Sequence, residues 1–233
     1  MTALRALVFD VFGTVVDWRS GVLSRARDVE TRTGVRADWG AVVDDWRRAY
    51  EPALLGARRT GAWRDLDELH RESLATVLAR HDLVLPASER EALVRSWRRL
   101  PAWPDARPGL ERLRRLHVTA TLSNGHVALL VDLLRFVDLR FDAVLSAQLA
   151  SSYKPDPVVY ATAAELLGLE PRLVGMVAAH GQDLVAAAEV GLRPLFVRRP
   201  QEWGSAGGEE PPHGLAGLVV AESLEDLADQ LDA

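Results

Sequence analysis

The sequence predicts an α/β fold, with a doubly wound, Rossmann-like parallel-sheet core and a helical cap inserted after the first strand. Two observations support this prediction. After Pro108, short apolar segments alternate with helical ones, whereas residues 20–100 contain only helical periodicity. Strands that alternate with helices form parallel sheets that helices cover on both faces.

The core begins with an apolar strand at residues 4–9, which ends at Asp10 and is followed by Gly13. Helices are expected at residues 109–116, 127–134, 158–167 and 184–190. The strands expected to follow or separate them cover residues 118–122, 143–146, 173–178, 194–197 and 218–220.

The cap is predicted from apolar residues at three- and four-residue spacing in segments 21–33, 39–55, 66–80 and 88–99. Pro101, Pro104 and Pro108 mark its end. We therefore expect a core domain of residues 1–17 and 104–233 and a cap domain of residues 18–103. The low-complexity segment 204–213 is expected to be a surface loop.

Composition excludes several classes of protein. The chain has 233 residues and a formal net charge of −5 without long runs of like charge, so nucleic-acid or membrane-surface partners are not expected. It has no cysteine, which excludes disulfides and thiol catalysis. No apolar stretch reaches the ~18 residues that span a bilayer. The N-terminus lacks the charged region, long apolar run and cleavage site that follow one another in a signal peptide. A cytoplasmic enzyme is expected.

Lys154 is the only lysine among 28 basic residues, and all the others are arginines. A compact ammonium differs chemically from a planar guanidinium, so this position is expected to need an ammonium. Chance survival of one lysine is the alternative.

Polar residues follow several predicted strands. Asp10, Ser123, Asn124 and Asp183 lie just beyond strand ends, where open parallel sheets bind their ligands. They are expected to converge on one crevice, although each residue type also favours ordinary turns.

Four motifs, in order along the whole chain, resemble those of the haloacid dehalogenase (HAD) superfamily. They are Asp10–Thr14 after an apolar strand, Leu122–Gly125, Tyr153–Asp156 and Val177–Asp183. The resemblance implies the fold described above, with the helical cap closing over a site in the core.

Two departures from the superfamily's phosphatases indicate a different reaction. Those enzymes carry a second aspartate two residues after the nucleophile, where this chain has Phe12, and an acidic magnesium ligand where it has Ala178–His180. A hard cation needs such oxygen ligands, and an alkoxide leaving group needs a proton donor. A halide needs neither. The chain thus resembles the subgroup that hydrolyses 2-haloacids without a metal or an organic cofactor.

The resemblance implies roles for individual residues. Asp10 would attack C2 of the haloacid, Arg47 and Asn124 would face the leaving halide, and Ser123 would bind the substrate carboxylate. Lys154 would keep Asp10 ionised. For Asp10 the alternatives are a helix cap or a salt-bridge partner, and for Arg47 a solvated arginine.

Further residues are expected around the nucleophile. Phe12 and Tyr160 are candidate substrate contacts, and Thr14 would hold Asp10 or its turn. Asp183 would orient Lys154 or the hydrolytic water. The alternative for Thr14 and Asp183 is a local capping role. The alternative for Tyr160 is packing within its helix.

His180 stands where many relatives have asparagine. With Asp183 it would position or deprotonate the water that cleaves the Asp10 ester, because its unperturbed pKa is near neutrality. A histidine that merely fills the place of an amide is the alternative.

The sequence therefore predicts a hydrolase that converts a short halogenated carboxylic acid to a 2-hydroxy acid through an aspartyl ester. The resemblance also implies L-enantiomer preference and a homodimer. The rival hypotheses are a phosphatase or phosphonate hydrolase of the same superfamily, and a non-catalytic binding protein that keeps the fold.

Overall fold

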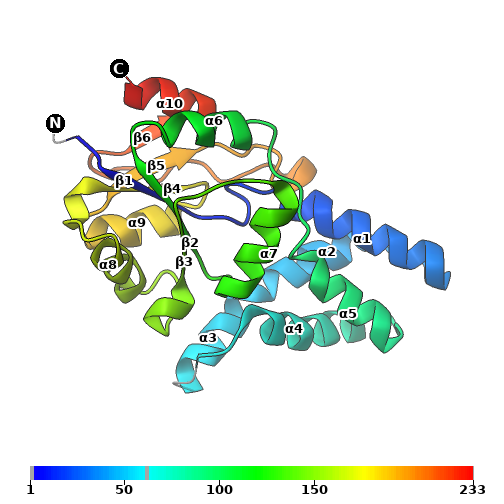
Figure 1. The fold of residues 1–233 in the computed structure, drawn as a ribbon. Helices are drawn as coiled ribbons and strands as arrows, with labels where there is room; N and C mark the ends of the chain where they lie inside the picture. The colour runs from blue at the N-terminus through cyan, green and yellow to red at the C-terminus, as the bar shows by residue number, and fades with distance from the viewer. Residues whose placement is uncertain (1–2, 61–62, 233) are drawn as a thin grey trace.

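The computed structural model describes residues 3–60 and 63–232, which form a parallel sheet flanked by helices (Figure 1). The strand order is β3-β2-β1-β4-β5-β6, and every neighbouring pair is parallel. This confirms the predicted α/β sheet, with β1 inside it. The strands are β1 (Ala6–Phe9), β2 (Val118–Ser123), β3 (Ala143–Ser146), β4 (Val174–Ala178), β5 (Arg193–Val197) and β6 (Val219–Ala221).

Alternation along β1 divides the apolar core into two layers. Leu7 and Phe9 pack on one side of the sheet, and Ala6 and Val8 on the other, because successive side chains of a strand point to opposite faces. The first layer holds helices α6 (Ala106–Leu113), α7 (Val127–Val137) and α10 (Leu224–Asp232). The second holds α8 (Pro157–Leu166) and α9 (Gly181–Glu189).

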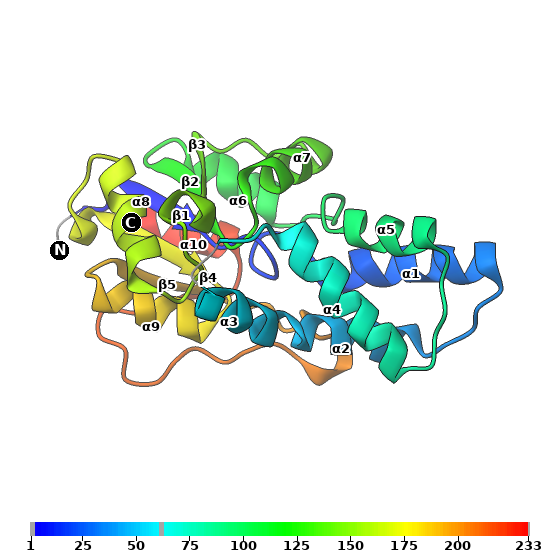
Figure 2. The same cartoon turned by 90° about the horizontal axis from the view of Figure 1, so that it is seen from below.

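Among the described residues, five helices lie between β1 and α6 in the chain and extend to one side of the sheet (Figure 2). Asp17, Asp38 and Asp65 each cap a helix by accepting a backbone N–H. The division into a core and a cap domain at residues 17/18 and 103/104 remains a prediction. The helices are α1 (Trp18–Thr33), α2 (Trp39–Arg48), α3 (Tyr50–Thr60), α4 (Leu66–Arg80) and α5 (Ala87–Ser96).

The structure corrects three details of the expected elements. The segment 39–55 is split between α2 and α3, with the break at Ala49. Pro108 lies in the first turn of α6 and not before the helix. The N–H groups of a first turn have no acceptor within the helix, so the N–H that proline lacks costs no hydrogen bond there. Helix α10 was not expected, although its charged and apolar residues alternate as on a surface helix.

Three short 3₁₀ helices complete the fold, at Ala147–Ala150, Pro171–Leu173 and Gly204–Ala206. In the part of the chain that the structure describes, no helix has both the length and the apolarity needed to cross a membrane.

Candidate active site

The predicted polar residues meet at the carboxyl ends of β1, β2 and β4. They line a pocket of about 180 Å³ to which α2 and α3 also contribute, so the helices that follow β1 and the sheet share one site. Thr14 and Tyr160, two of the predicted residues, do not line it but contact residues that do. The predicted residues in the lining are Asp10, Phe12, Arg47, Ser123, Asn124, Lys154, His180 and Asp183.

Lys154 connects two carboxylates at the base of the pocket. Its Nζ donates to Oδ1 of Asp10 at 2.8 Å and to Oδ2 of Asp183 at 2.5 Å. The hydroxyl of Tyr160 donates to the other oxygen of Asp183 at 2.9 Å. Lys154 thus lies beside Asp10, and Asp183 and Tyr160 fix its position.

Burial and neighbouring charge shift the pKa values of Asp10 and Lys154 in opposite directions. Burial would raise the pKa of Asp10, but the charge of Lys154 and the hydrogen bond from His180 bring that pKa well below its usual value. Burial would lower the pKa of Lys154, but the charges of Asp10 and Asp183 raise it. Asp10 is therefore an ionised carboxylate at neutral pH, as a nucleophile must be.

The second oxygen of Asp10 has different partners. Thr14 Oγ1 donates to Oδ2 of Asp10 at 2.8 Å and accepts the backbone N–H of Ala179 at 2.9 Å. Nδ1 of His180 lies 3.1 Å from the same Oδ2. Among the described residues, Oδ2 therefore meets a hydroxyl and an imidazole, whereas Oδ1 meets only the ammonium.

His180 contacts a carboxylate that the sequence did not indicate. Its Nε2 lies 3.0 Å from Oε1 of Glu202, whereas Asp183 bonds to Lys154 and Tyr160. Burial would lower the pKa of His180, but the negative charge of Glu202 and the hydrogen bond to Asp10 raise it well above its ordinary value. The raised pKa favours the protonated ring, whereas the base expected from the sequence would need a neutral one.

The Arg47 guanidinium lies against aromatic rings at the opposite wall. It is 4.7 Å from the ring centre of Tyr50 and 5.5 Å from that of Trp18. Its Nε is buried and has no hydrogen-bond partner among the described residues. Burial raises the pKa of the neighbouring Tyr50 to about 12, so that hydroxyl stays protonated.

Asn124 uses its amide to hold the loop that carries Lys154. Its Oδ1 accepts the backbone N–H of Lys154 at 2.6 Å, and its Nδ2 donates to the carbonyl of Lys154 at 3.3 Å. The same amide also forms a side-chain hydrogen bond with the hydroxyl of Tyr50, which lies in the same pocket. Ser123 is buried beside it and accepts the N–H of Gly125 at 3.3 Å.

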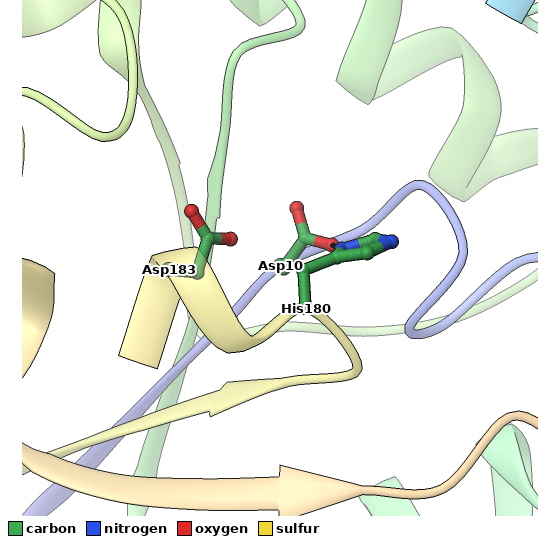
Figure 3. A group of neighbouring side chains, drawn as sticks. All are labelled: Asp10, His180 and Asp183. Carbon is green, nitrogen blue, oxygen red and sulfur yellow. Dashed lines mark hydrogen bonds and ion pairs between the residues drawn. The ribbon is translucent and has the colours of Figure 1, made fainter. Parts of the chain in front are cut away.

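The carboxylates could in principle bind a cation. Figure 3 shows the imidazole of His180 beside the Asp10 carboxylate, with Asp183 across from them. Their ligand atoms lie within 4.8 Å of one another. However, the Lys154 ammonium already bonds to both aspartates, and a raised pKa keeps a proton on His180. This arrangement does not fit a divalent metal, because the metal would face two positive groups.

Several described residues that line or support the pocket were not predicted from the sequence, Tyr50, Glu202 and Glu209 among them. Tyr50 follows Arg47 by three positions, a spacing that could have indicated it. Glu202 and Glu209 carry no such signal. Segment 204–213 is correspondingly not only a surface loop, because Glu209 lines the pocket and accepts the N–H of Gly181 at 2.9 Å.

Comparison with known proteins agrees with this geometry. Residues 4–191 match the family of haloacid dehalogenase-like hydrolases. The chain is 30% identical over 200 residues to (S)-2-haloacid dehalogenase 4A of Burkholderia cepacia, covering 84% of each chain. A solved L-2-haloacid dehalogenase is 38% identical, with a TM-score of 0.92 and 99% of both chains covered. The Xanthobacter autotrophicus L-2-haloacid dehalogenase, solved with chloropropionic acid covalently bound, is 26% identical, with a TM-score of 0.84 and 99% of both chains covered.

Proposed function

The chain belongs to the haloacid dehalogenase-like hydrolases, and from that premise we propose that it hydrolyses short 2-haloalkanoic acids to 2-hydroxy acids. It is a hydrolase of carbon–halide bonds. The relatives in the comparison are named as 2-haloacid dehalogenases of the S or L series, and one of them carries a covalently bound chloropropionic acid. We extend this substrate class, and the L-enantiomer, to the present chain.

The observation that carries the proposal is the ionised Asp10 in a small pocket beside Arg47 and Phe12. Asp10 attacks C2 of the acid and displaces the halide, and water then hydrolyses the resulting ester. Phe12 lies where the phosphatases of the superfamily have a second aspartate, so the site lacks that proton donor for an alkoxide. A halide leaves as a stable anion and needs no proton.

The proposed roles follow from position. The Arg47 guanidinium, whose buried Nε has no hydrogen-bond partner in the described part of the chain and which lies against aromatic rings, is suited to stabilise a departing halide. The Asn124 amide, which lines the same pocket, is assigned the same role, and the Ser123 hydroxyl is suited to the substrate carboxylate. Lys154, oriented by Asp183 and Tyr160, keeps Asp10 ionised.

Metal-independent catalysis is part of the proposal, because the Lys154 ammonium bonds to the two carboxylates that a metal would need. A homodimer and a cytoplasmic location complete it and remain predictions.

The test is halide release from a panel of chloro-, bromo- and fluoroacetate and the two enantiomers of 2-chloropropionate, with and without a chelator. Release of halide and of the 2-hydroxy acid in equal amounts supports the proposal. Failure to release halide from every acid, together with magnesium-dependent hydrolysis of a phosphate ester, would favour the phosphatase hypothesis.

A further inference from the structure

His180 lies between two carboxylates, and this position limits the protons it can carry. Nδ1 faces Oδ2 of Asp10 at 3.1 Å, and Nε2 faces Oε1 of Glu202 at 3.0 Å. An ionised carboxylate only accepts hydrogen bonds, so each ring nitrogen needs its own hydrogen to bond there. With both hydrogens present the ring is an imidazolium, and it has no lone pair for a water proton.

Burial and a second hydrogen bond hold the Glu202 carboxylate beside the His180 ring. Its side chain is 1% exposed, and its Oε1 also accepts the indole N–H of Trp18 at 2.9 Å. Gly13, whose φ is +90°, has no side chain that would occupy the space of Glu202 and His180. A Cβ at this position would lie 2.3 Å from Glu202 Oε1 and 3.0 Å from His180 Cε1. A buried carboxylate needs such partners, since an unpaired one is costly.

We propose, on the basis of the proposed function, that His180 is a cationic hydrogen-bond donor that stabilises negative charge on Oδ2 of Asp10 during ester hydrolysis. Glu202 is the positioning residue that keeps both ring nitrogens protonated and the ring aimed at Oδ2. His180 with Thr14 therefore forms an oxyanion site around one oxygen of the nucleophile, and does not activate water as a base.

The two oxygens of Asp10 therefore have different roles in the reaction. Oδ1, which meets Lys154, gives an electron pair to C2 while the carbon–halogen bond breaks and the halide keeps its bonding pair. Oδ2, which meets Thr14 and His180, becomes the carbonyl oxygen of the ester. The oxyanion site thus surrounds the atom on which charge develops in the next step.

The hydrolytic step closes the cycle. Water adds to Cγ of Asp10, one of its protons passes to Asp183, and Oδ2 takes the negative charge. The Cγ–Oδ1 bond then breaks, and Oδ1 leaves as the 2-hydroxyl oxygen of the product with a proton from Lys154. Asp183 returns its proton to Lys154, and the new carboxyl group of Asp10 releases the second water proton to solvent.

The decisive variant is Glu202→Gln, which keeps the size of the side chain and removes its charge. Without that charge the His180 ring loses a proton in the neutral range, so ester hydrolysis should slow by about tenfold or more at about pH 8 and recover toward about pH 6. The first halide burst should remain, and the Asp10 adduct should accumulate in quenched samples analysed by mass spectrometry. Glu210→Gln is the matched control, since Glu210 is an exposed carboxylate of the same loop that pairs with Arg198.

Wild-type rates of ester hydrolysis in Glu202→Gln across this pH range would overturn the inference while leaving the dehalogenase function intact. A wild-type enzyme that releases no halide would instead overturn the proposed function. If Glu202→Gln fails to fold, ¹⁵N NMR of the wild-type enzyme labelled at its six histidines decides the question, with the His180 signals assigned by their loss in His180→Asn. Both ring nitrogens should carry hydrogen at about pH 8, and a neutral ring would refute the proposal.

Discussion

The Nζ atom of Lys154 lies 2.8 Å from Oδ1 of Asp10, and the chain has no other lysine to take this place. The same ammonium reaches Asp183, so one compact cation serves two buried carboxylates. A planar guanidinium is wider and directs its hydrogens in a fixed fork. The position therefore depends on the shape of the cation as well as on its charge.

We expect Lys154→Arg to lose about 10²-fold or more in kcat, because a misplacement of about 1 Å at a reacting group has that effect. Steady-state halide release measures this loss, and circular dichroism checks that the variant is folded. The matched control is Arg58→Lys, which exchanges the same two cations at an exposed ion pair with Asp156. Kinetics of Lys154→Arg close to those of the wild type would mean that only charge matters at this position.

Asp10→Asn should release no halide above background, because a neutral amide is not a nucleophile toward carbon. The fold should survive, since asparagine keeps the size of the side chain. Halide release is measured immediately after purification, and mass spectrometry excludes deamidation to aspartate. Turnover by intact Asp10→Asn would rule out an aspartyl ester.

Exhaustive chelation should leave the rate of halide release unchanged. The reason is that the Lys154 ammonium takes the position between Asp10 and Asp183, and the raised pKa of His180 keeps that ring positive. The measurement compares chelated enzyme with and without added magnesium. A rate that falls on chelation and returns with magnesium would contradict this prediction.

Residues at strand ends were predictable because two local rules act together. Asp10, Ser123, Asn124 and Asp183 follow apolar segments of strand length, and carboxyl ends of parallel strands share one edge of the sheet. The order of the strands in the sheet does not follow from such rules. The sequence predicted a doubly wound parallel sheet that contains the first strand, but it did not predict the order of the strands.

The role of Glu202 as a partner of His180 could not be predicted from the sequence. It lies 22 residues after its partner His180, in a segment without helical or strand periodicity. Its burial depends on Trp18, which lies 184 positions away, and on the absence of a side chain at Gly13. No pattern in the sequence encodes such a three-way fit. From the sequence we expected Asp183 to act with His180 on the hydrolytic water, and a Glu202 carboxylate beside the ring was not expected.

Two substitutions of His180 separate a hydrogen-bond donor from a general base. An alanine can neither donate nor accept a proton, so His180→Ala should slow ester hydrolysis by about 10²–10³-fold, the usual effect of removing one oxyanion donor. The halide burst should persist, and the carboxyalkyl adduct should accumulate on Asp10. An asparagine amide can donate to Oδ2 but cannot take a proton from water.

His180→Asn should therefore retain much more ester hydrolysis than His180→Ala. Rapid quenching followed by mass spectrometry of the Asp10 peptide gives the decay of the adduct in both variants. Equal, severe loss in the two would indicate that His180 acts as a base, as first expected from its unperturbed pKa. Loss of the halide burst itself would instead mean that His180 acts in the first step, at the substrate or the departing halide.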